Sequence, residues 1–151
     1  MTEKEIGDVL FILRVGLPGA YLNLTPADTA AMVALWHEMF RDSPAGLVAA
    51  AAKTYIWRSD AGRFPTPGNL RKEMEQIQRA IDQCAYGSTL QEYMGGAAAE
   101  KFPPTVCDFI NTAAAEKYEQ RTGQKFTSQA QKLQMFRMQL TAGGSKHGQQ
   151  H

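Results

Sequence analysis

The sequence predicts an all-α protein: a compact helical bundle of about four N-terminal helices, two or three further C-terminal helices and a flexible tail. Apolar residues recur at helical spacing in successive segments, and Thr or Ser residues beside prolines mark where these segments begin. No segment alternates apolar and polar residues as a half-buried strand does. The length of 151 residues is typical of one domain with an appended segment.

The first two predicted helices have clear start signals. Thr2 with Glu5, and Thr25 with Asp28, have the three-residue spacing of a capping box, and Pro26 suits a first helical position. The expected buried face of the first helix holds Ile6, Val9, Leu10, Leu13 and Leu17. That of the second holds Met32, Leu35, Trp36, Met39 and Phe40. Residues 21–24 are expected to form an extended link between them.

A helix–helix corner is predicted over residues 53–74. Ser43, as the expected N-cap, and Pro44 after it indicate the start of a third helix, which would end just after Trp57. The expected buried face of this helix holds Leu47, Val48, Ala51, Ala52, Tyr55 and Ile56. After Phe64 and Pro65, Thr66 would cap a fourth helix. Its expected apolar seam holds Leu70, Met74, Ile77 and Ile81.

The remainder of the chain predicts shorter helices. Ser88 would cap one of them, Thr105 with Asp108 a second, and Ser128 a third. Gly123 is expected to end the second of these helices. The expected organisation is a helical adaptor domain over 1–83, an additional helical segment that is a candidate partner-binding region over 84–141, and a flexible tail over 142–151.

The residues that carry most enzyme chemistry do not cluster in this sequence. His37 is isolated, and Cys84 and Cys107 lack the spacing of a zinc site, so we expect no metal and two reduced thiols. Phosphate-binding loops, nucleophile elbows and dinucleotide fingerprints are not present. The sequence therefore predicts a protein that is not an enzyme, with no cofactor and no small-molecule substrate.

Hydropathy and the N-terminal residues predict a cytoplasmic location. No apolar run approaches the roughly 20 residues of a membrane-spanning helix. The start, Met-Thr-Glu-Lys-Glu, lacks the basic and then apolar layout of a signal peptide. We therefore expect no membrane partner.

Charge is distributed unevenly along the chain. The whole sequence has a formal net charge of only +1, yet residues 120–151 hold five Lys or Arg residues and no acid. Such a basic arm is suited to a polyanionic partner. The candidate nucleic-acid-binding residues are Arg121, Lys125, Lys132 and Arg137.

Candidate protein-binding residues lie at two places. At the corner, basic side chains alternate with aromatic ones, and Trp57 falls just off the apolar stripe of its helix. Near the C-terminus, apolar residues of the last predicted helix suit a partner groove. The candidate partner-binding residues are Trp57, Arg58, Arg63, Arg71, Lys72, Met135, Phe136 and Met138.

The order of these features resembles the N-terminal domain of the phage replicative helicase loader/inhibitor family. The resemblance covers about residues 3–80 and rests on corner residues rather than on a catalytic signature. The matching residues are Thr25-Pro26, Trp36, Ala52 with Tyr55-Ile56, Phe64-Pro65-Thr66-Pro67 and Leu70.

The resemblance implies an α-helical adaptor of phage DNA replication, acting in a bacterial host, that binds a hexameric replicative helicase and loads or restrains it. In that family the C-terminal segment is poorly folded and contacts the helicase. This chain departs from that pattern, because residues 88–140 resemble further helices and the end is basic. The basic residues could therefore reach an origin-binding protein or DNA. Two alternatives stay open: a small DNA-binding protein that uses the basic arm, or a phage inhibitor of another host protein.

Overall fold

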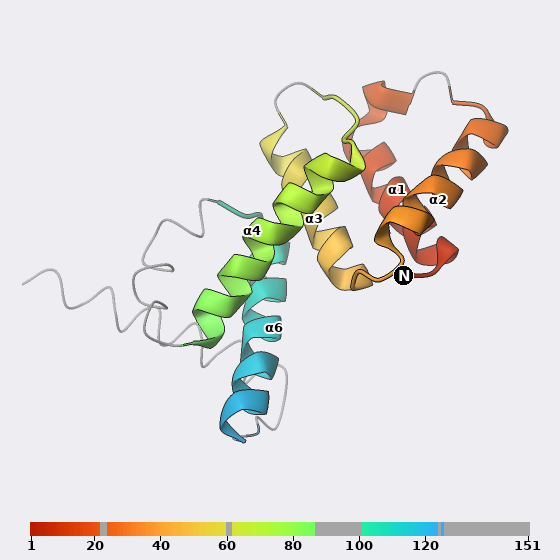
Figure 1. The fold of residues 1–151 in the computed structure, drawn as a ribbon. Helices are drawn as coiled ribbons and strands as arrows, with labels where there is room; N and C mark the ends of the chain where they lie inside the picture. Colours follow the sequence, from red (N-terminus) through yellow and green to blue (C-terminus); the bar gives the residue numbers. More distant parts are fainter. Residues whose placement is uncertain (22–23, 60–61, 87–100, 124, 126–151) are drawn as a thin grey trace, which may run out of the picture. The chain divides into compact units, whose positions relative to one another are not determined.

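The computed structural model describes residues 1–21, 24–59, 62–86, 101–123 and 125. Every regular element within these ranges is a helix, which confirms the all-α class (Figure 1). The elements are α1 (Glu3–Gly16), the 3-10 turn η1 (Pro18–Tyr21), α2 (Pro26–Phe40), α3 (Ala45–Arg58), α4 (Pro67–Ala85) and α6 (Pro104–Thr122).

The chain divides into two compact units, Met1–Ile77 and Gln78–His151. The division falls within α4, upstream of the boundary near residue 83 that the sequence indicates. The helices predicted after Ser88 and Ser128, and the tail over 142–151, lie outside the described residues.

In the first unit, α1 packs against both α2 and α3. The predicted face of α1 is buried from Ile6 to Leu17, as the helical spacing requires. On α3, Ala51 and Ala52 are fully buried, and their small side chains allow neighbouring helices to approach closely. Ile56, near the end of α3, lies against Gly16 at the end of α1.

Three helix starts follow the predicted capping chemistry. Thr2 and Glu5 form a capping box, as do Thr25 and Asp28, in which each side chain accepts a hydrogen bond from the other residue's backbone N–H. Thr66 accepts from the Asn69 backbone at 3.2 Å, while the Asn69 side chain accepts from the Thr66 backbone at 2.9 Å. Each box satisfies backbone donors that the first turn of a helix leaves unpaired.

Two predicted caps and part of the predicted link are wrong. Pro44 and Pro103 stand at the N-caps of α3 and α6, with no side-chain cap hydrogen bond, so neither Ser43 nor Thr105 caps a helix. Before α6 the order Pro-Pro-Thr places Pro104 at the first helical position, where its fixed φ suits the helix, and this moves Thr105 inside the helix. Tyr21, expected in the extended link, closes η1 instead.

The predicted buried stripe of α2 is also wrong in part. Only Trp36 and Phe40 are buried, one helical turn apart. Leu35 is 50% exposed and Met39 41% exposed. The helix therefore contacts the rest of its unit along a narrow face, and the apolar side chains beside that face remain open to solvent.

The two glycines of α1, Gly7 in its first half and Gly16 at its last residue, provide a test of this packing. A Cβ on Gly7 would have no heavy atom within 4 Å, whereas a Cβ on Gly16 would lie 2.5 Å from Ile56 Cδ1 and 2.8 Å from its Cγ2. Gly7→Ala should raise the free energy of unfolding by about 0.5–1 kcal/mol through helix propensity. Gly16→Ala should lower it, by about 1–3 kcal/mol, because the β-branched Ile56 cannot turn away freely. Urea unfolding measures both changes, and equal effects at the two positions would contradict the packing.

Candidate functional site

The corner predicted from sequence is held by an aromatic cluster, which we define as Trp36, Phe40 and Phe64. The Trp36 ring centroid lies 5.8 Å from that of Phe40 and 5.6 Å from that of Phe64, with tilted planes. Pro65, which follows Phe64 in the sequence, is almost fully buried. The Tyr55 hydroxyl donates a hydrogen bond to the Arg63 carbonyl at 3.2 Å. These residues are therefore part of the architecture of the corner.

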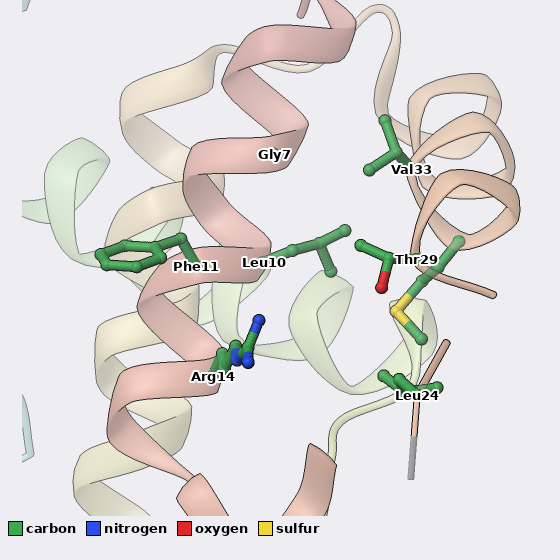
Figure 2. Close-up of a pocket in the computed structure, with 8 residues that line it drawn as sticks. Gly7, Leu10, Phe11, Arg14, Leu24, Thr29 and Val33 are labelled. Carbon is green, nitrogen blue, oxygen red and sulfur yellow. The ribbon is translucent and has the colours of Figure 1, made fainter. Parts of the chain in front are cut away.

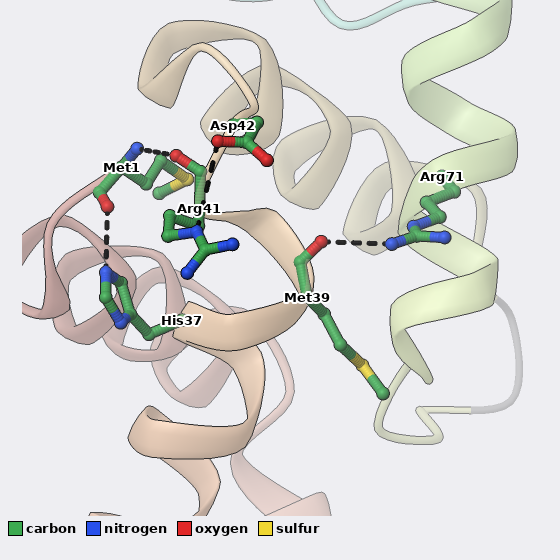
Figure 3. Close-up of polar contacts among 6 residues, drawn as sticks. All are labelled: Met1, His37, Met39, Arg41, Asp42 and Arg71. Atoms are coloured by element: carbon green, nitrogen blue, oxygen red, sulfur yellow. Dashed lines mark hydrogen bonds and ion pairs between the residues drawn. The ribbon is translucent and has the colours of Figure 1, made fainter.

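Two of the predicted partner-binding cations also serve this architecture. Arg58, at the end of α3, donates to Glu73 and to Gln76 on α4, each at 2.7 Å. The side chains of Arg58 and Glu73 are only 28% and 13% exposed, so the pair is largely shielded from water. Arg71 donates to the Met39 carbonyl at 3.0 Å (Figure 3), and its guanidinium lies 5.9 Å from the centroid of the Phe40 ring.

Other predicted contact residues at the corner remain open to solvent. Trp57 is 48% exposed, as its position off the α3 stripe indicated, and Arg63 and Lys72 are exposed as well. Exposed Trp and Arg side chains suit a protein contact, because both residue types are enriched among residues that dominate binding energy. Whether these side chains contact a partner stays a prediction.

Only some of the predicted C-terminal contact residues belong to the described part of the chain. Met135, Phe136, Met138, Lys132 and Arg137 lie outside the described residues. Arg121, at the end of α6, donates to the Ala85 carbonyl at 3.0 Å and stacks near the rings of Tyr86 and Tyr118. Lys125 is exposed. The Arg121 guanidinium is therefore engaged within its own unit.

Helices α1 and α2 enclose an apolar groove that the sequence did not reveal (Figure 2). Its volume is about 190 Å³. The described residues that line it are Gly7, Leu10, Phe11, Arg14, Leu24, Thr29, Met32 and Val33. Sequence reasoning assigned Leu24 to a link and Met32 to the core. The available signal was Phe11, a large aromatic residue that does not fall on the apolar stripe of α1.

Large apolar side chains are exposed on α1, on α2 and just before α2. Phe11 and Val15 are each 65% exposed and are one helical turn apart on α1. Leu35 and Met39 have the same spacing on α2, and Leu24 precedes that helix. We call Phe11, Val15, Leu24, Leu35 and Met39 the apolar surface set. Phe11 and Val15 share one side of α1, and Leu35 and Met39 share one side of α2, so each pair offers a partner two adjacent apolar side chains.

His37 and the N-terminal amino group make hydrogen bonds within the fold, and both cysteines are at least partly buried. His37 Nε2 lies 3.0 Å from the Met1 carbonyl, and the Met1 amino group donates to the Arg41 carbonyl (Figure 3). Burial raises the pKa of Cys84 to about 11 and also raises the pKa of Cys107, so both thiols are poor nucleophiles near neutral pH.

Among the residues that the structure describes, no three His, Cys, Asp or Glu side chains gather as metal ligands. Within the same residues, no helix has both the length and the apolar character needed to cross a membrane.

In the second unit, Asp82 on α4 and Lys117 on α6 form an ion pair. Lys117 Nζ lies 2.6 Å from Asp82 Oδ1. The hydrogen bond from Lys117 lowers the pKa of Asp82 below its ordinary value of 3.8, and the same bond raises the pKa of Lys117 above 10.5. Folding therefore favours the charged form of both groups.

This ion pair predicts a stability change in acid. Since the pKa of Asp82 is lower in the folded protein, the unfolded chain binds more protons near pH 3.8. The contribution is complete above that pH and is lost as pH falls through the folded pKa. Asp82→Asn should flatten the loss of melting temperature below about pH 4, and Lys117→Met should flatten it less, because Gln78 still donates a hydrogen bond to Asp82. Circular dichroism melts across pH 2–6 measure this, and a slope unchanged in both variants would contradict it.

Comparison of the chain with protein-family models, with curated proteins and with solved structures gives no match.

Proposed function

We propose that this protein is a non-enzymatic adaptor of phage-type DNA replication, which binds a hexameric replicative helicase and loads or restrains it in the cytoplasm of a bacterial host. The observation that carries the proposal is the apolar surface set on α1 and α2. The identity of the partner rests on the resemblance of residues 3–80 to the helicase loader/inhibitor family.

The apolar surface set supports protein binding on energetic grounds. Covering a Leu, Met or Phe side chain that was exposed to water gains about 1.5–3 kcal/mol when burial is complete. Leu35 and Met39 are half exposed, so a partner that covers both gains part of this amount at each. Trp57, Arg63 and Lys72 would add polar and aromatic contacts at the corner.

The helicase proposal is tested by measuring binding of the full chain to purified replicative helicase from the bacterial host. We expect a saturable complex in biolayer interferometry. The double variant Leu35→Ser with Met39→Ser should weaken it by about tenfold or more, because it removes the apolar contact of two exposed residues. A matched control replaces the exposed residues Ala30 and Ala34 of the same helix by Ser, and this should leave the affinity unchanged within about twofold.

A second comparison locates the contact along the chain. If a chain without residues 120–151 binds as the full chain does, the first 119 residues are sufficient; if binding is lost, the basic arm supplies the contact. No complex with helicase in either chain would end the helicase proposal. Binding of the full chain to duplex DNA alone, in the absence of helicase, would favour the DNA-binding alternative.

A further inference from the structure

We infer that the groove between α1 and α2 docks an amphipathic helix of a partner protein, which inserts one apolar side chain and places a carboxylate beside Arg14. This inference deepens the proposed adaptor function, on which it rests for the existence of a protein partner. It places the contact with the partner protein in this groove and specifies two features of the partner helix, an apolar side chain and a carboxylate.

The groove has two apolar walls and an open edge. Leu10 from α1 points toward Thr29 and Val33 on α2 (Figure 2). At Gly7 the α1 backbone carries no side chain, and a Cβ there would meet no heavy atom within 4 Å. The Thr29 hydroxyl donates to the Thr25 carbonyl at 3.1 Å, so its hydrogen is already used within α2. An incoming side chain therefore meets a mainly apolar surface.

The volume of the groove favours a side chain over a small-molecule ligand. Drug-sized ligands occupy pockets of about 300–1,000 Å³ that enclose most of their surface. This groove holds only about 190 Å³ and is partly open to solvent. A single Leu, Met or Phe side chain is of the right size. Recognition of an amphipathic helix uses such anchors at positions i, i+3, i+4 and i+7.

Charge specifies the second feature of the partner. Among the described residues that line the groove, Arg14 is the charged one, and it is exposed. A guanidinium beside an apolar groove favours a carboxylate, with which it forms charge-assisted hydrogen bonds. The partner helix should therefore carry Asp or Glu about one turn from its apolar anchor. Phe11 lines the groove and is 65% exposed, so a partner helix along α1 would also cover it.

The test uses the full chain and two labelled helical peptides of about 18 residues, in fluorescence anisotropy. Both carry Leu or Phe at i, i+3 and i+7; one has Glu at i+4 and the other has Lys there. The Glu peptide should bind more tightly than the Lys peptide by about tenfold. Gly7→Trp, which fills the groove, should weaken binding of the Glu peptide by about tenfold or more. The matched Gly7→Ala should change the affinity for this peptide by less than about twofold.

Charge reversal gives an independent measurement in case Gly7→Trp unfolds the protein. Arg14→Glu, at an exposed position, should reverse the preference so that the Lys peptide binds more tightly. No saturable binding of the Glu peptide, equal binding of the two peptides, or an affinity unaffected by Arg14→Glu would overturn the inference. Self-association of the chain that Gly7→Trp abolishes would also overturn it, since the occupant would then be a second copy.

The helicase measurement separates this inference from the proposed function. A helicase complex that persists in Gly7→Trp and Arg14→Glu would leave the adaptor proposal standing and place the contact elsewhere. Peptide binding with the predicted charge preference, but no complex with helicase, would retain the groove as a protein-binding site and remove helicase as its partner.

Discussion

Contact among Trp36, Phe40 and Phe64 is the interaction on which the first unit depends. It joins α2 to the segment that precedes α4, and aromatic rings in tilted contact contribute beyond the area they bury. Arg71 adds a second link, because its guanidinium reaches the end of α2 and lies against Phe40. Arg58 with Glu73 then ties α3 to α4.

This cluster also determines what α2 leaves exposed. The helix uses Trp36 and Phe40 for its anchoring contact, and these residues occupy a narrow face. Leu35 and Met39 lie to the side of that face and remain in contact with water. On α1, the buried stripe likewise leaves Phe11 and Val15 outside the core. The residues that hold the fold together and those proposed to bind a partner are thus neighbours on the same helices, and the groove lies between these two helices.

Local chemistry explains which features could be predicted from sequence. Thr2, Thr25 and Thr66 cap helices as expected, because capping depends on residues only three positions apart. The buried face of α1 follows from its spacing. The exposure of Leu35, by contrast, depends on how many other helices pack against α2. Helical periodicity in the sequence does not predict that number.

The groove could not be predicted for a similar reason. Gly7 and Leu24 both line the groove although they are 17 residues apart in the sequence, so their proximity depends on the tertiary fold. Hydrogen–deuterium exchange of the full chain, with and without saturating helicase, tests most directly whether this face binds the partner. We predict slower exchange of amides in α1 and α2, around residues 7–15 and 28–39. A saturated complex in which exchange of these amides is unchanged would contradict the assignment of the binding surface to α1 and α2.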